Sequence, residues 1–208
     1  MKLGGFNFGG YLDGVKEVLD RLPLERVERI CDIIYQAYLD DQTLFIFGNG
    51  GSAALASHLA CDLGKGTHNP GSLGMSGVKR LKVISLTDSV PMITAWANDS
   101  SYEEVFAEQM VNFIQAGDVA FGISASGNSP NVLKALELAK RAGATTVGIT
   151  GFQGGKMNAL LDWGIVVPSD NMQQIEDAHL VLAHTIFLDL RQRIRALAAE
   201  KKHTAAAP

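Results

Sequence analysis

The chain alternates short apolar segments with stretches of helical periodicity, and this alternation restricts the folds that it can adopt. Five segments have the composition of buried strands: residues 43–47, 82–86, 118–123, 145–150 and 164–167. Helical patterns lie between them, at residues 52–63, 90–97, 102–115 and 131–142. Parallel strands need crossover connections, and these helices can supply them. We therefore predict an α/β protein, a three-layer α/β/α sandwich around a five-stranded parallel sheet.

Helical segments outside this repeat begin and end the chain. Two helices are predicted before residue 42, and a long one over 172–199 is apolar on more than one stripe. One stripe can pack on the sheet, which leaves another for a partner, so we expect homo-oligomerisation through helices. We predict a single domain over 1–200, with 1–42 as a helical extension used in oligomerisation. The polar, alanine-rich residues 201–208 are predicted to form a disordered tail.

Composition excludes several classes of protein. The 208 residues include 18 Lys and Arg against 22 Asp and Glu, which gives no overall basic surface for nucleic acid. No apolar run approaches the roughly 18 residues of a membrane span, and the N-terminus lacks the apolar segment of a signal peptide. Cys31 and Cys61 lie far apart in helical patterns and are predicted to be reduced thiols. We therefore expect a soluble, cytoplasmic protein.

A glycine-rich loop follows the first predicted strand and opens a helix. Its residues are Gly48, Asn49, Gly50, Gly51 and Ser52. Free backbone N–H groups and the helix dipole at such a junction favour an anionic or polar ligand, although a tight turn alone would also use glycine. The spacing matches a dinucleotide fingerprint, but the first acidic residue after the next strand, Asp88, comes 40 residues after Gly48 instead of about 20. We therefore predict no nucleotide cofactor.

A second loop, after the third predicted strand, carries the most informative residues. It contains Ser124, Ala125, Ser126, Gly127, Asn128 and Ser129, and Pro130 then opens a helix. A simple helix cap needs one hydroxyl, whereas this loop has three and contains no Lys or Arg. Neutral donors at a helix N-terminus suit a sugar phosphate better than a nucleoside triphosphate with its metal.

Two pairs of side chains could form an acid–base or metal site. His58 and Asp62 are four residues apart on one predicted helix, and Glu176 and His184 are eight apart on another, so each pair shares a helix face. Two imidazoles and two carboxylates are a plausible tetrahedral donor set for zinc. Spacing alone does not separate this from ordinary hydrogen bonds between helical neighbours.

Together these motifs resemble the SIS-domain phosphoheptose isomerases. The resemblance runs from about residue 10 to 195 and rests on both loops, on Ala97-Asn98-Asp99 and on the glycine-rich residues 150–157. It implies a flavodoxin-like fold in a homotetramer, with active sites at subunit interfaces. It further implies conversion of sedoheptulose 7-phosphate to D-glycero-D-manno-heptose 7-phosphate through a cis-enediol, in the biosynthesis of nucleotide-activated heptose.

The resemblance also assigns roles to residues of this chain. Asp62 would be the catalytic base and His184 the acid, and one zinc ion per subunit would be held by His58, Asp62, Glu176 and His184. Substrate would contact Asn49, Gly50, Gly51, Ser52, Asp62, Asn98, Asp99, Ser124, Ala125, Ser126, Ser129 and Glu176. The chain departs from the family at Asp62, where Glu is usual, at Glu176, where Gln is usual, and at Ala125, where Thr is usual. His179 is expected to be packed in the core or at an interface instead of catalytic.

Two alternatives to an enzyme stay open at this stage. One is a non-catalytic SIS-domain tetramer that regulates a replication-initiator protein, and the other is a sensor that binds a sugar phosphate without turnover. The shorter Asp62 favours a site without catalysis, whereas retention of His184 favours an enzyme, because a site without catalysis needs no acid.

Overall fold

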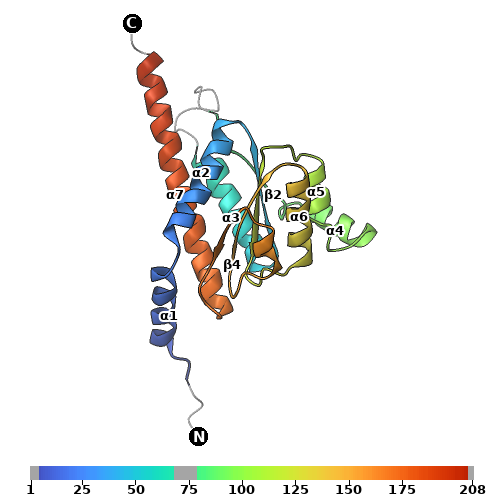
Figure 1. The fold of residues 1–208 in the computed structure, drawn as a ribbon, viewed down its shortest axis with the longest axis vertical. Coiled ribbons are helices and arrows are strands. Elements are labelled where there is room, and N and C mark those ends of the chain that lie inside the picture. Colours follow the sequence, from blue (N-terminus) through green and yellow to red (C-terminus); the bar gives the residue numbers. More distant parts are fainter. Residues whose placement is uncertain (1–4, 68–78, 206–208) are drawn as a thin grey trace.

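The computed structural model describes residues 5–67 and 79–205, and a parallel sheet forms its centre (Figure 1). The strands are β1 (Thr43–Gly48), β2 (Lys82–Ser85), β3 (Val119–Ser124), β4 (Thr145–Thr150) and β5 (Trp163–Val166). They pair in the order β2-β1-β3-β4-β5, and every pair is parallel. The central strands β1 and β3 are buried on both faces, as their apolar composition predicts.

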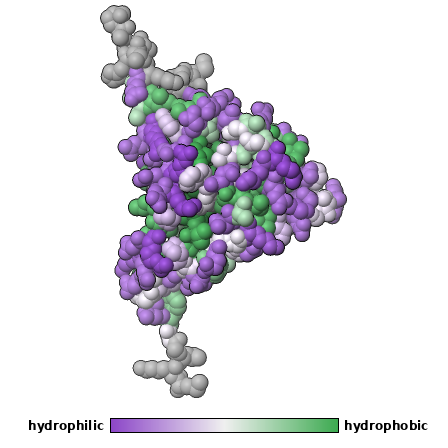
Figure 2. Space-filling view, in the orientation of Figure 1, coloured by the Kyte–Doolittle hydropathy of each residue, from purple (hydrophilic) through white to green (hydrophobic). Residues whose placement is uncertain are grey.

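Helices cover both faces of the sheet, which confirms the predicted three-layer sandwich (Figure 1). The helices are α1 (Phe8–Asp20), α2 (Leu24–Leu39), α3 (Gly51–Gly66), α4 (Val90–Asp99), α5 (Ala107–Val111), α6 (Pro130–Arg141), the 3-10 helix η1 (Lys156–Ala159) and α7 (Met172–Ala205). One hydrophobic cluster joins α1, α2, α3 and α7 to one face of the sheet, and a second joins α5, α6 and η1 to the other. In Figure 2, hydrophobic patches alternate with hydrophilic ones on the surface seen in this orientation.

From β1 the chain adds β2 on one side and then returns to add β3 on the other, so a topological switch point lies between β1 and β3. This switch point determines where a ligand can bind. In open parallel sheets, ligands bind in the crevice beyond the carboxyl ends of the strands, at such a switch point. The two loops singled out in the sequence leave β1 and β3 at this position. Gly48 pairs with Ile123 so closely that a Cβ atom on Gly48 would lie 2.7 Å from the Ile123 carbonyl oxygen. Glycine is therefore required there for the two strand ends to meet.

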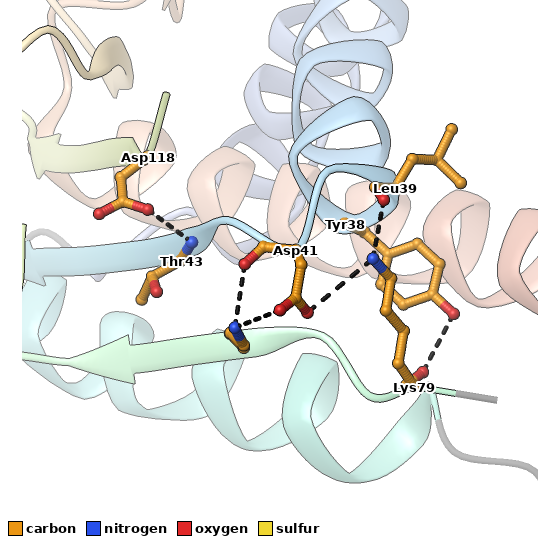
Figure 3. Close-up of polar contacts among 7 residues, drawn as sticks. Tyr38, Leu39, Asp41, Thr43, Lys79 and Asp118 are labelled. Atoms are coloured by element: carbon orange, nitrogen blue, oxygen red, sulfur yellow. Dashed lines mark hydrogen bonds and ion pairs between the residues drawn. The ribbon is translucent and has the colours of Figure 1, made fainter. Parts of the chain in front are cut away.

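At the opposite end of the strands, where β1 and β2 begin, polar contacts stabilise the fold (Figure 3). The Asp118 carboxylate accepts a hydrogen bond from the Thr43 backbone N–H at 2.8 Å, which fixes the start of β1. Asp41 adopts a left-handed conformation with φ of 63° and pairs with Lys82 at 2.6 Å. The side-chain hydrogen bond from Lys82 is the largest cause of the lowered pKa of Asp41. These charged side chains bind one another and the backbone. The candidate place for a ligand is therefore the other end of the strands, at their carboxyl ends.

The structure corrects two of the predicted segments. The helix predicted over 102–115 is confined to α5, and the chain before it forms turns, in which Glu103 and Glu104 form ion pairs with Lys134 of α6. The predicted disordered tail is helical as far as Ala205, since lysine and alanine extend an existing helix readily. Residues 206–208, and most of the loop predicted over 64–80, lie outside the described residues.

Other expectations from composition are met. Cys31 and Cys61 are both free thiols, the first buried and the second exposed. Among the described helices, none has both the length and the apolar character that crossing a membrane would require.

Candidate functional site

The first loop brings the start of α3 to the switch point. Gly50 caps α3 with φ of 55°, a left-handed conformation that favours glycine. The backbone N–H groups of Ala53 and Ala54 donate to the Gly50 carbonyl, whereas those of Gly51 and Ser52, the first two residues of the helix, have no acceptor within it. This turn can therefore donate hydrogen bonds to an anionic or polar ligand, as predicted for a binding loop.

The second loop is held rigidly against a third one. Gly127 has φ of 63°, and a Cβ atom there would lie 2.1 Å from the Gly154 carbonyl oxygen, so only glycine fits. The Asn128 side-chain oxygen accepts a hydrogen bond from the Lys156 backbone N–H at 3.0 Å. These contacts tie the serine loop to the 151–157 loop and fix its backbone before any ligand arrives.

The hydroxyl groups of this loop gather at the start of α6. The Oγ atoms of Ser124 and Ser129 lie 3.2 Å apart, and the Ser126 hydroxyl accepts a hydrogen bond from the Asn128 N–H. Ala125 is buried, and its carbonyl accepts a hydrogen bond from the Gly151 N–H at 2.8 Å, which leaves its backbone N–H as its polar group for a ligand. The loop thus offers neutral hydroxyl donors and a helix N-terminus, the combination predicted for a phosphate.

A cluster of metal-binding type lies between α3 and α7. His58 Nε2 lies 3.4 Å from Asp62 Oδ2 and 3.4 Å from His184 Nε2, and the three ligand atoms all fall within 4.8 Å of one another. Two ligand atoms bound tetrahedrally at 2.0–2.1 Å from one zinc ion are about 3.3 Å apart. The geometry and the donor types of these three residues therefore fit a divalent metal ion.

Glu176 lies apart from the other three predicted metal ligands. Its carboxylate lies at the start of α3, where a Cβ atom on Gly51 would be 3.2 Å from Oε1. A rise of about 12 Å along α7 separates it from His184, and the group of close ligand atoms does not include it. In the structure, the predicted four-ligand set is therefore reduced to three residues.

A cavity of about 240 Å³ connects Glu176 to the metal-binding cluster. It is lined by Gly51, Ser52, Ala54, Leu55, His58, Glu176, His179 and Leu180. His58 belongs to both the cavity and the cluster, so a ligand in the cavity would reach the start of α3 at one end and the cluster at the other.

His179 forms a buried wall of this cavity. Its Nε2 atom lies 3.1 Å from the Thr150 carbonyl oxygen, and burial lowers its pKa to about 4. The imidazole is therefore neutral at pH 7 and donates to that carbonyl. This agrees with the prediction that His179 is packed in the core instead of catalytic.

Asn98 and Asp99 end α4 and are exposed. The Asn98 side chain donates a hydrogen bond to the Asp99 carboxylate at 2.8 Å, and neither residue lines the cavity. Tyr102, a few residues later, does reach the first loop, because its hydroxyl donates to Asn49 Oδ1 at 3.0 Å. The structure thus links this part of the chain to the site through a residue that the sequence analysis did not identify.

Asn131 is the second residue that the sequence analysis missed. It is 2% exposed, lies in the first turn of α6 and exchanges two hydrogen bonds with Asn49. Its sequence signal is only an asparagine in the first turn of the helix that follows the serine loop, where a helix-capping residue is also common.

Comparisons with known proteins identify the family of the chain. The SIS domain family model matches residues 10–151. A phosphoheptose isomerase of Sulfurimonas denitrificans is 38% identical over 165 residues, which cover 78% of each chain. One of Aliarcobacter butzleri is 36% identical and covers 86% of this chain and 90% of that protein. The solved structure of phosphoheptose isomerase GmhA from Neisseria gonorrhoeae superposes with a TM-score of 0.77 at 30% identity, covering 86% of this chain and 91% of the other. The chain therefore belongs to the phosphoheptose isomerase family of SIS-domain proteins.

Proposed function

We propose that this protein is an aldose–ketose isomerase that converts sedoheptulose 7-phosphate to D-glycero-D-manno-heptose 7-phosphate, in the biosynthesis of nucleotide-activated heptose. The observation that carries the proposal is the approach of Asp62 and His184 to each other beside a cavity that reaches the first switch-point loop at Gly51 and Ser52. The names of its relatives in the phosphoheptose isomerase family supply the substrate.

The switch-point loops would hold the phosphate and the sugar chain. Ser124, Ser126 and Ser129 would donate their hydroxyl groups to the phosphate, and the N-terminus of α6 would add its dipole. Along α3, the rise from Ser52 to His58 is about 9 Å. This separation suits an elongated substrate, bound at one end by its phosphate and presented at the other to the cluster. Asn49, Gly50, Gly51 and Glu176 would line its path, with Asn98 and Asp99 contacting sugar hydroxyls.

Asp62 and His184 would move the protons of the reaction. Asp62 would take the proton from C1 of the ketose while His184 gives a proton to the C2 carbonyl oxygen, which yields a cis-enediol. The proton held by Asp62 would then return to C2, while His184 takes the proton of the C1 hydroxyl, and the aldose results. No atom is gained or lost. A carboxylate has two oxygens, so Asp62 can serve as a base at one of them while the other is engaged.

A divalent metal ion fits this site, and we propose zinc, one per subunit. His58, Asp62 and His184 would hold it, since imidazole and carboxylate are donors that zinc favours. When bound, such an ion polarises a carbonyl or hydroxyl oxygen.

We further propose a cytoplasmic homotetramer with active sites at subunit interfaces. Exposed apolar side chains on the helices outside the sheet support an interface: Phe8 and Leu12 on α1, and Leu180, Val181 and Leu188 on α7. Leu180 also lines the cavity, so a partner packed on this part of α7 would border the site.

The test is one-dimensional NMR of the purified protein with sedoheptulose 7-phosphate in D₂O, with and without Zn²⁺. We expect conversion of the sugar, with deuterium incorporated at C2 of the aldose and at C1 of the ketose. Asp62→Asn and His184→Gln should each lower turnover by at least about a hundredfold. Asp20→Asn, at an exposed position of α1, serves as the matched control and should leave turnover unchanged. Binding of the sugar without turnover would instead favour a sensor or regulator.

A further inference from the structure

A network of side chains joins the first loop to the helix that follows the second. Asn49 Nδ2 donates to Asn131 Oδ1 at 2.8 Å, and Asn131 Nδ2 donates back to Asn49 Oδ1 at 2.9 Å. The Tyr102 hydroxyl donates to the same Asn49 oxygen at 3.0 Å. Asn131 is almost completely buried, whereas Asn49 is half-buried at the site. A buried amide such as that of Asn131 destabilises the fold unless its hydrogen bonds are made. We therefore asked what the paired amides do at the site.

The network permits only one orientation of the Asn49 carboxamide. Asn131 Oδ1 also accepts a hydrogen bond from the Val132 backbone N–H at 2.9 Å. A backbone N–H can only donate, so this contact fixes which end of the Asn131 amide is oxygen. The reciprocal pair then fixes the Asn49 amide, and the Tyr102 hydroxyl, which can donate or accept, donates to the oxygen placed there. Rotating the Asn49 amide by 180° would place donor against donor.

Counting the hydrogen-bonding capacity of Asn49 shows what remains for a ligand. An amide oxygen accepts two hydrogen bonds and an amide nitrogen donates two. Both acceptor positions of Asn49 are used, by Asn131 and Tyr102, and one of its two donors is used by Asn131. One N–H is left, and no acceptor capacity is left.

We propose that Asn131 and Tyr102 are positioning residues, which hold the Asn49 carboxamide so that it presents only an N–H donor to the ligand. At Asn49 the site therefore selects a ligand atom that accepts a hydrogen bond, such as a phosphate, carbonyl or hydroxyl oxygen. It rejects a group that can only donate. The identity of the ligand as a sugar phosphate rests on the function proposed above.

Neighbouring ion pairs keep Tyr102 in place. Glu103 and Glu104, directly after it, pair with Lys134 at 3.1 and 2.5 Å. Lys134 lies one helical turn beyond Asn131 on α6. The segment that carries the Tyr102 hydroxyl is thus paired with the same helix that carries Asn131, so the two groups approach Asn49 from neighbouring segments.

Steady-state kinetics with sedoheptulose 7-phosphate test the proposal. Asn131→Ala and Tyr102→Phe should each raise KM about three- to tenfold, the usual effect of losing one neutral hydrogen bond, with a smaller change in kcat. Asn112→Ala and Tyr35→Phe remove the same groups at positions outside the site and should leave KM unchanged. In an Asn49→Ala background, Asn131→Ala should have almost no further effect, because a residue that acts through Asn49 has nothing left to position. An equal rise in KM in both backgrounds would overturn the proposal.

A measurement without ligand separates this proposal from the proposed function. If the wild-type protein neither binds nor converts the sugar, the proposed function fails. NMR of protein labelled with ¹⁵N-asparagine then still tests whether Asn131 holds the Asn49 carboxamide in one orientation. The Asn49 side-chain resonances, assigned by their absence in Asn49→Ala, should show one proton that exchanges slowly with water, and Asn131→Ala should remove this protection. If the Asn49 protons exchange as fast as those of exposed Asn112 in the wild type, the proposal is wrong.

Discussion

Lowering the pH should destabilise this fold through His179. Burial holds the pKa of His179 at about 4 in the folded protein, against the ordinary histidine value of 6.5. Above pH 6.5 the residue is neutral in both states and has no effect. Between pH 6.5 and about 4 the unfolded chain binds the additional proton, so the free energy of unfolding falls as the pH falls. Each pH unit costs about 1.4 kcal/mol, which sums to about 3 kcal/mol over this interval. Below pH 4 both states are protonated and the effect levels off.

Urea denaturation at half-unit pH steps, at fixed protein concentration and with a chelator present, measures this dependence. His179→Gln keeps an N–H for the Thr150 carbonyl but cannot be protonated, so its stability should be flatter than that of the wild type between pH 6.5 and 4. Asn112→Ala, which changes an exposed uncharged residue, is the control for substitution itself and should keep the wild-type slope. If wild type and His179→Gln have the same slope over this interval, burial of a neutral imidazole does not govern the acid sensitivity.

Three further substitutions separate the parts of the site. Asp62→Asn removes the anionic member of the metal cluster and should weaken Zn²⁺ binding by at least about tenfold, measured by competition with a chromogenic chelator; unchanged affinity would contradict its role as a ligand. Gly127→Ala combines a left-handed φ with a contact of 2.1 Å to the Gly154 carbonyl and should lower the free energy of unfolding by at least about 2 kcal/mol. Gly9→Ala, on α1, where a Cβ atom would lie at an ordinary contact distance of 3.8 Å from Asn7 Oδ1, should not destabilise the protein. Ser129→Ala should raise KM for the sugar phosphate about tenfold while leaving Zn²⁺ affinity unchanged, and a parallel loss of both would mean that the loop and the cluster are not independent.

The parts of the fold that local composition determines are predictable from sequence. The five strands and the two switch-point loops lie within a residue or two of their predicted positions, because a buried parallel strand must be continuously apolar and a loop that meets a ligand needs glycine and hydroxyl groups. The pair of His58 and Asp62 is predictable for a similar reason, since a spacing of four residues on a helix brings two side chains together whatever else surrounds them.

Contacts between distant segments could not be predicted in this way. The reciprocal bonding of Asn49 and Asn131 joins residues 82 positions apart, and no local pattern distinguishes Asn131 from a helix-capping residue. The helix expected over 102–115 is confined to Ala107–Val111, and the ion pairs of Glu103 and Glu104 with Lys134 become visible only when α6 is in place. Glu176 shares a helix face with His184, as its spacing indicates, but the packing of α7 against the start of α3 directs its carboxylate toward Gly51.

The position of Glu176 leads to a prediction about the charge of the site. The family that this chain resembles has Gln at this point, and the acidic residue adds a negative charge beside the N-terminus of α3. That end of the helix attracts anions, so the Glu176 carboxylate competes there with an anionic substrate and opposes an enediolate forming in the cavity that both share.

Glu176→Gln should therefore lower KM for sedoheptulose 7-phosphate and raise kcat, since the amide keeps the shape of the side chain and removes the charge. It should leave Zn²⁺ affinity within about threefold of the wild type, because the carboxylate lies outside the cluster of His58, Asp62 and His184. Asp177→Asn, the neighbouring residue with its carboxylate bound to Tyr11, is the control for loss of one charge at this end of α7. If Glu176→Gln instead loses more than about tenfold in Zn²⁺ affinity, the carboxylate moves to the metal when the ion binds, and the set of four ligands predicted from the sequence is the correct one.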